Sequence, residues 1–374
     1  MELYELIAPC HFGLEAVMKR EILDLGYEIE RVEDGKVTFL ADAEGIAYAN
    51  LFLRTTERIL LKVGQVHAET YDELFEATKA LPWEKFIPKN GKFWVTKANS
   101  IKSKLFSPSD IQSIMKKAIV ERLKQVYHME WFPEDGAQYP IRVSILKDEV
   151  TIGLDTSGVS LHKRGYRKLT AKAPITETLA AALIMLTPWK GDRILVDPFC
   201  GSGTLLIESA LKALNIPPCL DREFTAMQWE FLPKELWDEE REALRANIRK
   251  PENFKLYGFD IDPEAVRLTR DNAAKAGVGE YIEVNRRDVA EFTYPEGCTA
   301  VLCNPPYGER MLDEEQAHEL YRVMGKRMLP TDGRRLFVIT PDGEFEELFG
   351  KKADKNRKLY NGMLMCRLYS YFKG

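Results

Sequence analysis

The second half of the chain contains short apolar runs separated by segments with helical character, and this alternation restricts the fold more than any other feature. Continuous apolar runs are typical of strands that are buried on both faces, and strands alternating with helices form parallel, doubly wound sheets. The runs are Arg193–Val196, Lys255–Phe259, Ile282–Asn285, Ala300–Cys303 and Arg335–Thr340. This half is therefore predicted to be an α/β domain of Rossmann-like architecture.

The first half of the chain is predicted to contain smaller α+β units. Apolar and alternating patterns predict strands and helices in the order of a ferredoxin-like unit, at residues 3–8, 13–25, 37–40, 43–53 and 58–66. A helix at 71–80, a strand at 92–97, a helix from Asp110 to Tyr127 and a hairpin at 141–155 follow. The character changes after Asp155, which places a domain boundary there.

Basic residues are concentrated in one stretch, although the net charge of the chain is −5. Between Lys92 and Lys124 there are eight basic residues and only two acidic ones, Asp110 and Glu121. A local excess of positive charge of this kind indicates a surface that can bind phosphates.

Two other features bear on where and how the protein acts. No apolar run approaches the roughly 20 residues that span a bilayer, and the start of the chain lacks the pattern of a signal peptide, so a cytoplasmic location is expected. The six cysteines are scattered and no histidine lies at metal-ligand spacing, so neither a metal site nor a disulfide framework is expected.

A glycine-containing loop follows the first apolar run of the second half, with the sequence Asp197-Pro198-Phe199-Cys200-Gly201-Ser202-Gly203-Thr204, and a helix begins directly after it. Ligands of doubly wound sheets bind beyond the carboxyl ends of the strands, where glycines allow the main chain to approach them. The next two strands end in Asp260-Ile261-Asp262 and near Asp288. Each acid alone is more often a helix cap, but acids after three successive strands favour a nucleotide-like ligand with ribose hydroxyls.

The fourth strand runs into Asn304-Pro305-Pro306-Tyr307, a stiff turn at the same edge of the sheet. An aromatic amine is a poor nucleophile because its lone pair is delocalised into the ring. Hydrogen bonds from the amine to the Asn304 side-chain oxygen and the Pro305 carbonyl would direct that lone pair towards a sulfonium methyl group, and Tyr307 could stack on the base. Cys200 and Cys303 lie nearby, but this motif suits an amine, so neither cysteine is given a role.

These motifs together resemble the class I S-adenosylmethionine (SAM) methyltransferases, specifically the THUMP-bearing RNA guanine-N2 methyltransferases, a group also labelled N6-adenine-specific DNA methylases. The resemblance covers nearly the full length of the chain. Its most specific part is the connector from Asp155 to Arg167, with Ala173-Pro174 and Glu177 after it. This connector is similar to the branch that methylates guanine N2 in 23S ribosomal RNA.

The resemblance implies a ferredoxin-like unit at residues 1–64, a THUMP RNA-binding domain at 65–160, and a class I methyltransferase domain at 161–374 that uses SAM. The catalytic motif would be Asn304, Pro305, Pro306 and Tyr307. The implied cofactor-binding residues are Asp197, Phe199, Gly201, Ser202, Gly203, Thr204, Asp260, Ile261, Asp288, Asn304 and Glu177. The expected RNA-binding residues are Lys97, Lys102, Lys104, Lys116, Lys117, Lys124, Arg164 and Arg167.

An insertion is expected at about residues 215–253, on the substrate side of the methyltransferase domain. It carries four aromatic residues, Phe224, Trp229, Phe231 and Trp237. Such side chains can stack on flipped bases, but packing in a local core is the more common role of buried aromatics.

The local residues leave several functions open. Adenine N6 in DNA or RNA presents the same kind of amine as guanine N2, as do a guanine in tRNA and the side-chain amide of a protein glutamine. The first half of the chain favours RNA as the substrate. A different class, a non-catalytic RNA-binding or ribosome-assembly factor, is disfavoured by the intact series of loop, acids and motif.

Overall fold

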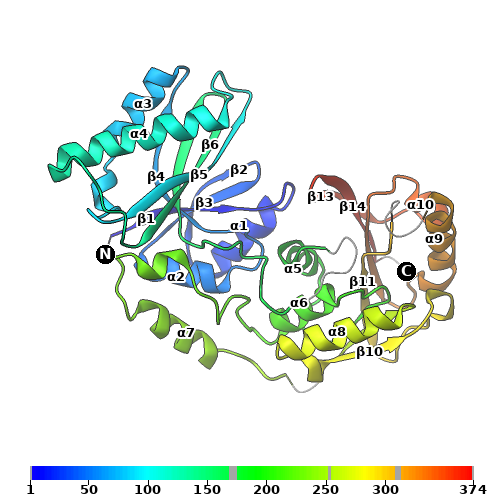
Figure 1. Ribbon diagram of the computed structural model, residues 1–374. Coiled ribbons are helices and arrows are strands. Elements are labelled where there is room, and N and C mark those ends of the chain that lie inside the picture. Colours follow the sequence, from blue (N-terminus) through cyan, green and yellow to red (C-terminus); the bar gives the residue numbers. More distant parts are fainter. Residues whose placement is uncertain (1, 168–174, 252–253, 308–312, 373–374) are drawn as a thin grey trace.

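The computed structural model describes residues 2–167, 175–251, 254–307 and 313–372, and within them the chain forms two seven-stranded sheets (Figure 1). The predicted α/β fold is confirmed for the second half, and the first half has the predicted α+β character. In the described part of the chain, no helix is both long and apolar enough to cross a membrane.

The first sheet has the strand order β2-β3-β1-β4-β7-β6-β5. Its strands are β1 (Tyr4–Pro9), β2 (Glu28–Glu33), β3 (Lys36–Ala41), β4 (Leu60–His67), β5 (Lys92–Ile101), β6 (Gln138–Leu146) and β7 (Glu149–Asp155). β4 pairs with β1 on one side and with β7 on the other. The sheet is therefore continuous across residue 64, where we place the limit between the ferredoxin-like unit and the THUMP domain.

Four helices cover one face of this sheet, namely α1 (Glu15–Asp24), α2 (Ala43–Phe52), α3 (Tyr71–Ala80) and α4 (Pro108–Tyr127) (Figure 1). The helix starts follow from local chemistry. Ser107 caps α4 by accepting a hydrogen bond from the Asp110 amide, and Pro108 occupies the first turn, where its missing N–H has no cost. The other face of the sheet carries polar side chains along much of its length.

The second sheet has the order β10-β9-β8-β11-β12-β14-β13. Its strands are β8 (Ile194–Asp197), β9 (Leu256–Asp260), β10 (Ile282–Arg286), β11 (Cys298–Cys303), β12 (Arg335–Thr340), β13 (Lys355–Asn361) and β14 (Leu364–Tyr371). The five strands β8 to β12 pair in parallel with one another, and β14 is antiparallel to both β12 and β13. Its helices are α5 (Glu177–Leu186), α6 (Thr204–Ala213), α8 (Pro263–Lys275), α9 (Glu314–Met328) and α10 (Phe345–Phe349).

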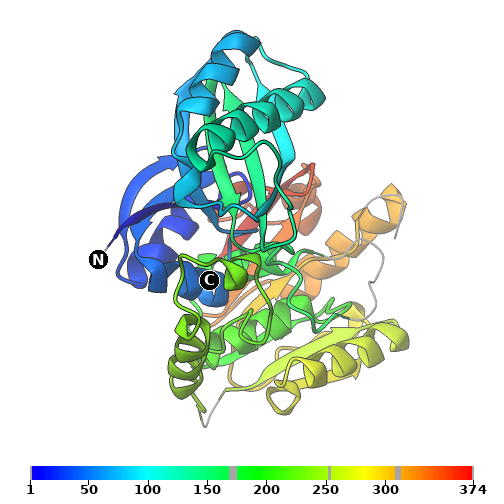
Figure 2. The same ribbon diagram turned by 60° about the vertical axis from the view of Figure 1, so that its left-hand side comes forward.

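The segment between α6 and β9 leaves the second sheet and packs against the first half of the chain (Figures 1 and 2). Its helix α7 (Leu236–Ala246) contacts α2. The Trp229 ring stacks on Tyr139 at a centroid distance of 5.4 Å and its indole N–H donates to the Gln138 carbonyl. Phe224, Trp229 and Trp237 are buried, so these aromatics join the two halves and do not face a substrate.

Candidate functional site

The loop between β8 and α6 brings its main chain to the carboxyl-terminal edge of the parallel strands. Gly201 and Gly203 have φ angles of +53° and +81°, in the left-handed region that favours glycine. A Cβ atom at Gly203 would lie 2.6 Å from Thr269, whereas one at Gly201 would meet no atom closer than 4.0 Å. The loop is thus packed against α8 at Gly203 and open at Gly201, as close approach of a ligand requires.

Asp260 stabilises this loop from the end of β9. One carboxylate oxygen accepts from the Gly201 amide at 2.9 Å and the other from the Asp262 amide at 3.0 Å. Burial raises the pKa of Asp260. The neighbouring Ile261 is 59% exposed, an unusual position for an isoleucine, and it offers an apolar surface to a flat ring beside Asp260.

The other two strand-end acids differ in their surroundings. Asp197 is buried, with one oxygen accepting from the Phe199 amide at 3.0 Å, and burial followed by the nearby Asp260 charge raises its pKa to about 8. Asp288 is exposed and accepts from the Ala290 amide at 2.8 Å. Asp197 therefore supports the loop from the protein interior, and Asp288 lies at the solvent-exposed surface.

The turn after β11 places an unpaired acceptor at the same edge. The Oδ1 atom of Asn304 is buried and accepts no hydrogen bond from any described residue. Pro305 is buried beside it, and the Tyr307 hydroxyl accepts from Asn361 Nδ2 at 3.3 Å. A buried carbonyl-type oxygen without a partner is costly, so the site is arranged to receive a donor such as an amine.

Two expected RNA-binding arginines lie in the interior. The Arg164 side chain is 1% exposed, lies 3.5 Å from Glu208, and donates to the carbonyl oxygens of Leu161 and Arg54. Its guanidinium is not accessible to a phosphate, so we leave Arg164 out of the RNA surface.

Arg167 is placed beside the cofactor loop. It donates to Thr204 Oγ1 and to the Ile175 carbonyl, each at 2.8 Å, and lies 3.5 Å from the buried Glu177. This position suits support of the loop better than contact with RNA. Ser202 and Thr204 are also buried in the loop, and Asn272 donates to the Ser202 carbonyl. Ala173-Pro174 of the connector lie outside the described residues.

The thiols near the site are not activated. Cys200 and Cys303 are buried, and burial raises the pKa of each well above its usual value. A thiolate nucleophile needs a lowered pKa, so the surroundings support the assignment of no role. In the described part of the chain, no three His, Cys, Asp or Glu side chains are grouped as a metal site would require.

The predicted basic cluster is divided between the two faces of the first sheet. On α4 and at its ends, glutamates neutralise much of the charge: Lys104 pairs with Glu69, Lys116 with Glu134 and Lys124 with Glu130. Lys116 also lies over the Phe93 ring, and Lys117 over the Phe75 ring. These pairings come from residues far from the basic stretch or just beyond it, so counting charges within the stretch overstated its potential.

The open face of the sheet carries a groove of about 780 Å³ that includes Lys97 and Lys102. Both lysines are exposed and, among the described residues, neither has a carboxylate within ion-pairing distance. The groove also contains Asn99, Lys147 and Arg142, the last of which pairs with Asp155 at 2.8 Å. It reaches Phe12 and Glu57 at the junction with the second half.

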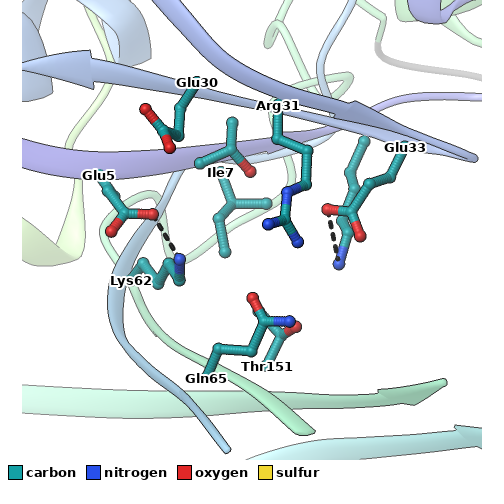
Figure 3. A pocket seen from close by; sticks show the side chains of 10 residues that line it. Glu5, Ile7, Glu30, Arg31, Glu33, Lys62, Gln65 and Thr151 are labelled. Carbon is teal, nitrogen blue, oxygen red and sulfur yellow. Dashed lines mark hydrogen bonds and ion pairs between the residues drawn. The ribbon is translucent and has the colours of Figure 1, made fainter. Parts of the chain in front are cut away.

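A smaller cavity of about 80 Å³ adjoins this face and is unsuited to phosphates (Figure 3). Lys62 pairs with Glu5, and Lys36 with Glu33. Figure 3 shows these carboxylates around the cavity with Arg31 pointing between them. Because both of its lysines are paired with glutamates, this small cavity is a solvated part of the sheet surface.

Comparison with known families divides the chain into three matched parts. Residues 164–370 match the RMKL-like methyltransferase domain, residues 5–60 the RlmL ferredoxin-like domain, and residues 68–155 the THUMP domain. The ranges agree with the order of units expected from the sequence.

Individual proteins are similar over the same length. The chain is 45% identical to YpsC of Bacillus subtilis (strain 168), provisionally named an RNA methyltransferase, covering 100% of this chain and 97% of that protein. It is 30% identical to the ribosomal RNA large subunit methyltransferase K/L of Hahella chejuensis, covering 99% of this chain but only 53% of the relative. The crystal structure of SMU.472, provisionally a methyltransferase and complexed with S-adenosylhomocysteine (SAH), superposes with a TM-score of 0.94 at 39% identity, covering 100% and 99% of the two chains.

Proposed function

The chain belongs to the RMKL-like methyltransferase family with RlmL ferredoxin-like and THUMP domains, and on this premise we propose that it methylates the exocyclic N2 amine of a guanine in 23S ribosomal RNA. Membership makes it a SAM-dependent RNA methyltransferase. The guanine, its N2 atom and the ribosomal RNA are the parts that we propose. A relative that matches 99% of this chain, over 53% of its own length, is named for ribosomal RNA of the large subunit.

The observation that carries the proposal is the buried Oδ1 of Asn304, which accepts no hydrogen bond from the part of the chain that the structure describes. An amine that donates one hydrogen to this oxygen and a second to the Pro305 carbonyl presents its lone pair away from both. The same contacts stabilise the positive charge that develops on nitrogen during transfer. No strong general base is needed, because the alkylated amine is acidic enough to lose its proton to water.

The residues present fit the cofactor of the family. The open side of Gly201, after β8, lies beside the carboxylate of Asp260 and the exposed Ile261, at the end of β9, and these groups would hold the methionine, ribose and adenine parts respectively. When bound, SAM supplies an electrophilic methyl group on a sulfonium. Asn304 and Tyr307 would hold the target amine at the same edge of the sheet, which supplies rate through positioning.

We propose the groove on the open face of the first sheet as the path of the RNA backbone. Its unpaired Lys97 and Lys102 can neutralise phosphates without first breaking an ion pair. By contrast, Lys104 and Lys124 have glutamate partners, and a phosphate would have to compete with them. Phosphate contacts of this kind position an RNA and do not read its sequence.

Replacing Lys97 and Lys102 together with alanine is expected to weaken RNA binding and to reduce its salt dependence. Two lost phosphate contacts lower the slope of log K against log salt concentration by about 1.5. Filter binding of a 23S rRNA transcript between low and moderate salt would measure this slope. The matched double variant at Lys104 and Lys124 should change the slope less. An equal change in both variants would contradict the proposed groove and indicate that the α4 side also binds the RNA.

Nucleoside mass spectrometry tests the substrate directly. We expect rRNA from a strain lacking the gene to lose N2-methylguanosine from the large subunit, and purified protein with SAM to restore it. Unchanged RNA would contradict the proposal. Loss of N6-methyladenosine instead, or of N2-methylguanosine from tRNA alone, would keep the amine chemistry and replace the substrate.

A further inference from the structure

The acceptor that defines the reaction is recessed. Asn304 Oδ1 is buried and Pro305 beside it is buried as well. A base within a helical stack exposes only its edge, so its amine cannot reach an oxygen below the surface. If the substrate is a guanine in structured RNA, as proposed above, the nucleotide must leave its stack before transfer.

Extrusion of a base leaves a gap between its former neighbours. Proteins that unstack bases commonly fill such a gap with an apolar side chain such as Met, Leu, Ile or Phe. A side chain with this role has to be exposed in the free protein, next to the catalytic motif, and supported by a rigid element.

The turn between β13 and β14 satisfies the first requirement. Asn361 pairs with Leu364, which leaves Gly362 and Met363 as a two-residue turn. Gly362 has a φ of +62°, as the first position of a type II′ turn demands. Met363 is 99% exposed, and Leu364 and Met365 are 45% and 39% exposed. Turn positions usually favour polar residues or glycine, so an apolar tip is unexpected from folding alone.

The turn also lies beside the catalytic motif. Asn361, two residues before Met363, donates to the Tyr307 hydroxyl at 3.3 Å. Two residues of extended chain span about 7 Å. The main chain of Met363 is therefore within about 7 Å of the main chain of Asn361, whose side chain contacts Tyr307.

The hairpin is held from both halves of the chain. β13 and β14 pair continuously from Lys355 to Asn361. The Phe12 ring lies 6.3 Å from the Tyr360 ring, and a Cβ atom at Gly13 would be only 2.8 Å from the Lys358 carbonyl oxygen. Phe12 also lines the groove that contains Lys97. A path thus leads from the groove, past Phe12 and Tyr360, to the turn and Tyr307.

We propose that Met363 is a positioning residue that enters the RNA stack and occupies the space vacated by the target guanine. Its unbranched thioether adapts to the irregular gap between two bases. It touches neither the reacting nitrogen nor the methyl group, and its contribution is to keep the extruded nucleotide from returning to the stack.

The variant Met363→Ser tests this role with little risk of misfolding, because the side chain is almost fully exposed. Two RNA hairpins would carry the guanine identified by mass spectrometry, one with the guanine paired to cytosine and one with it opposite an abasic site. On the paired hairpin we expect kcat/KM to fall about tenfold or more. On the second hairpin, where extrusion is easy, it should stay close to the wild-type value.

Two controls complete the experiment. Met363→Leu keeps an apolar wedge and should restore most of the activity on the paired hairpin. Leu329→Ser removes a 39% exposed leucine that follows α9 and precedes the start of β12, away from the carboxyl ends of the parallel strands. It should leave the activity on both hairpins unchanged. Unchanged activity of Met363→Ser on the paired hairpin, or an equal loss on both hairpins, would contradict the proposed positioning role of Met363. If the wild-type protein methylates neither hairpin, the proposed function fails and the wedge fails with it.

Discussion

Replacing Asn304 with alanine is expected to slow methyl transfer by about 10²- to 10³-fold, the usual effect of removing one preorganised polar group that stabilises transition-state charge. The reason is local: the Oδ1 atom is buried and has no partner among the described residues, and in the proposed function it accepts a hydrogen from the target amine. Single-turnover transfer from labelled SAM measures the rate. SAH affinity, measured by calorimetry, should change little, because the loop at Gly201 and Asp260 is untouched.

Two further variants identify which property of Asn304 matters. Asn304→Asp keeps an acceptor oxygen at the Oδ1 position and replaces the amide NH₂ by a second oxygen, and it should retain much more activity than Asn304→Ala. Asn356→Ala removes an exposed asparagine from the edge strand β13 and should be neutral. A wild-type rate of methyl transfer in Asn304→Ala would rule out the proposed role. Equal losses of rate in the alanine and aspartate variants would show that the amide N–H groups of Asn304 are the important ones.

Three strands were missed from the sequence, β2, β13 and the interior strand β14 (Leu364–Tyr371), and the first two share one physical property. β2 reads Glu-Ile-Glu-Arg-Val-Glu and β13 reads Lys-Asn-Arg-Lys-Leu-Tyr-Asn, and both are edge strands. Edge strands are protected by charged side chains against pairing with other chains, so β2 and β13 lack the apolar signal that marked the interior strands β8, β9, β11 and β12. Hairpin pairing with the neighbouring strands β3 and β14 fixes them instead.

The same distinction applies to the candidate site. Asp197, Asp260 and Asn304 could be predicted because each follows a buried strand, and parallel strands bring their carboxyl ends to one edge. The roles of Arg164 and Asn361 depend on partners that lie far away in sequence, Glu208 and Tyr307. A local pattern does not contain these partners, so an exposed arginine was expected where a buried ion pair occurs.

Replacing Asp197 with asparagine is expected to stabilise the cofactor-free protein, increasingly so as the pH rises towards 8. Burial raises the pKa of Asp197 from 3.8 to about 8, so at neutral pH the carboxyl is protonated in the folded chain and ionised in the unfolded chain. Folding then takes up a proton, and the wild-type protein loses about 1.4 kcal/mol of stability per pH unit between these two pKa values. Asparagine keeps the acceptor for the Phe199 amide and has no such dependence.

Thermal or urea unfolding of both proteins at pH 5 and pH 8 measures this effect, with SAH absent. The advantage of Asp197→Asn should be larger at pH 8 than at pH 5, whereas Asp262→Asn, a change at the exposed cap of α8, should show no comparable trend. A constant difference between wild type and Asp197→Asn at both pH values would contradict a raised pKa.

The same carboxyl predicts how cofactor binding depends on pH. The methionine end of SAM or SAH carries an ammonium group, and we expect Asp197 to release its proton when it pairs with that charge. SAH affinity of the wild-type protein should therefore increase by up to about tenfold per unit as the pH rises from 6 to 8, and level off above the pKa of Asp197. Calorimetry in two buffers of different ionisation enthalpy would detect the released proton. Asp197→Asn should bind SAH weakly, with no proton release and a flat pH profile. If that variant instead binds SAH as well as the wild type, Asp197 supports the loop through Phe199 without contacting the cofactor, and the ammonium must be held by another group.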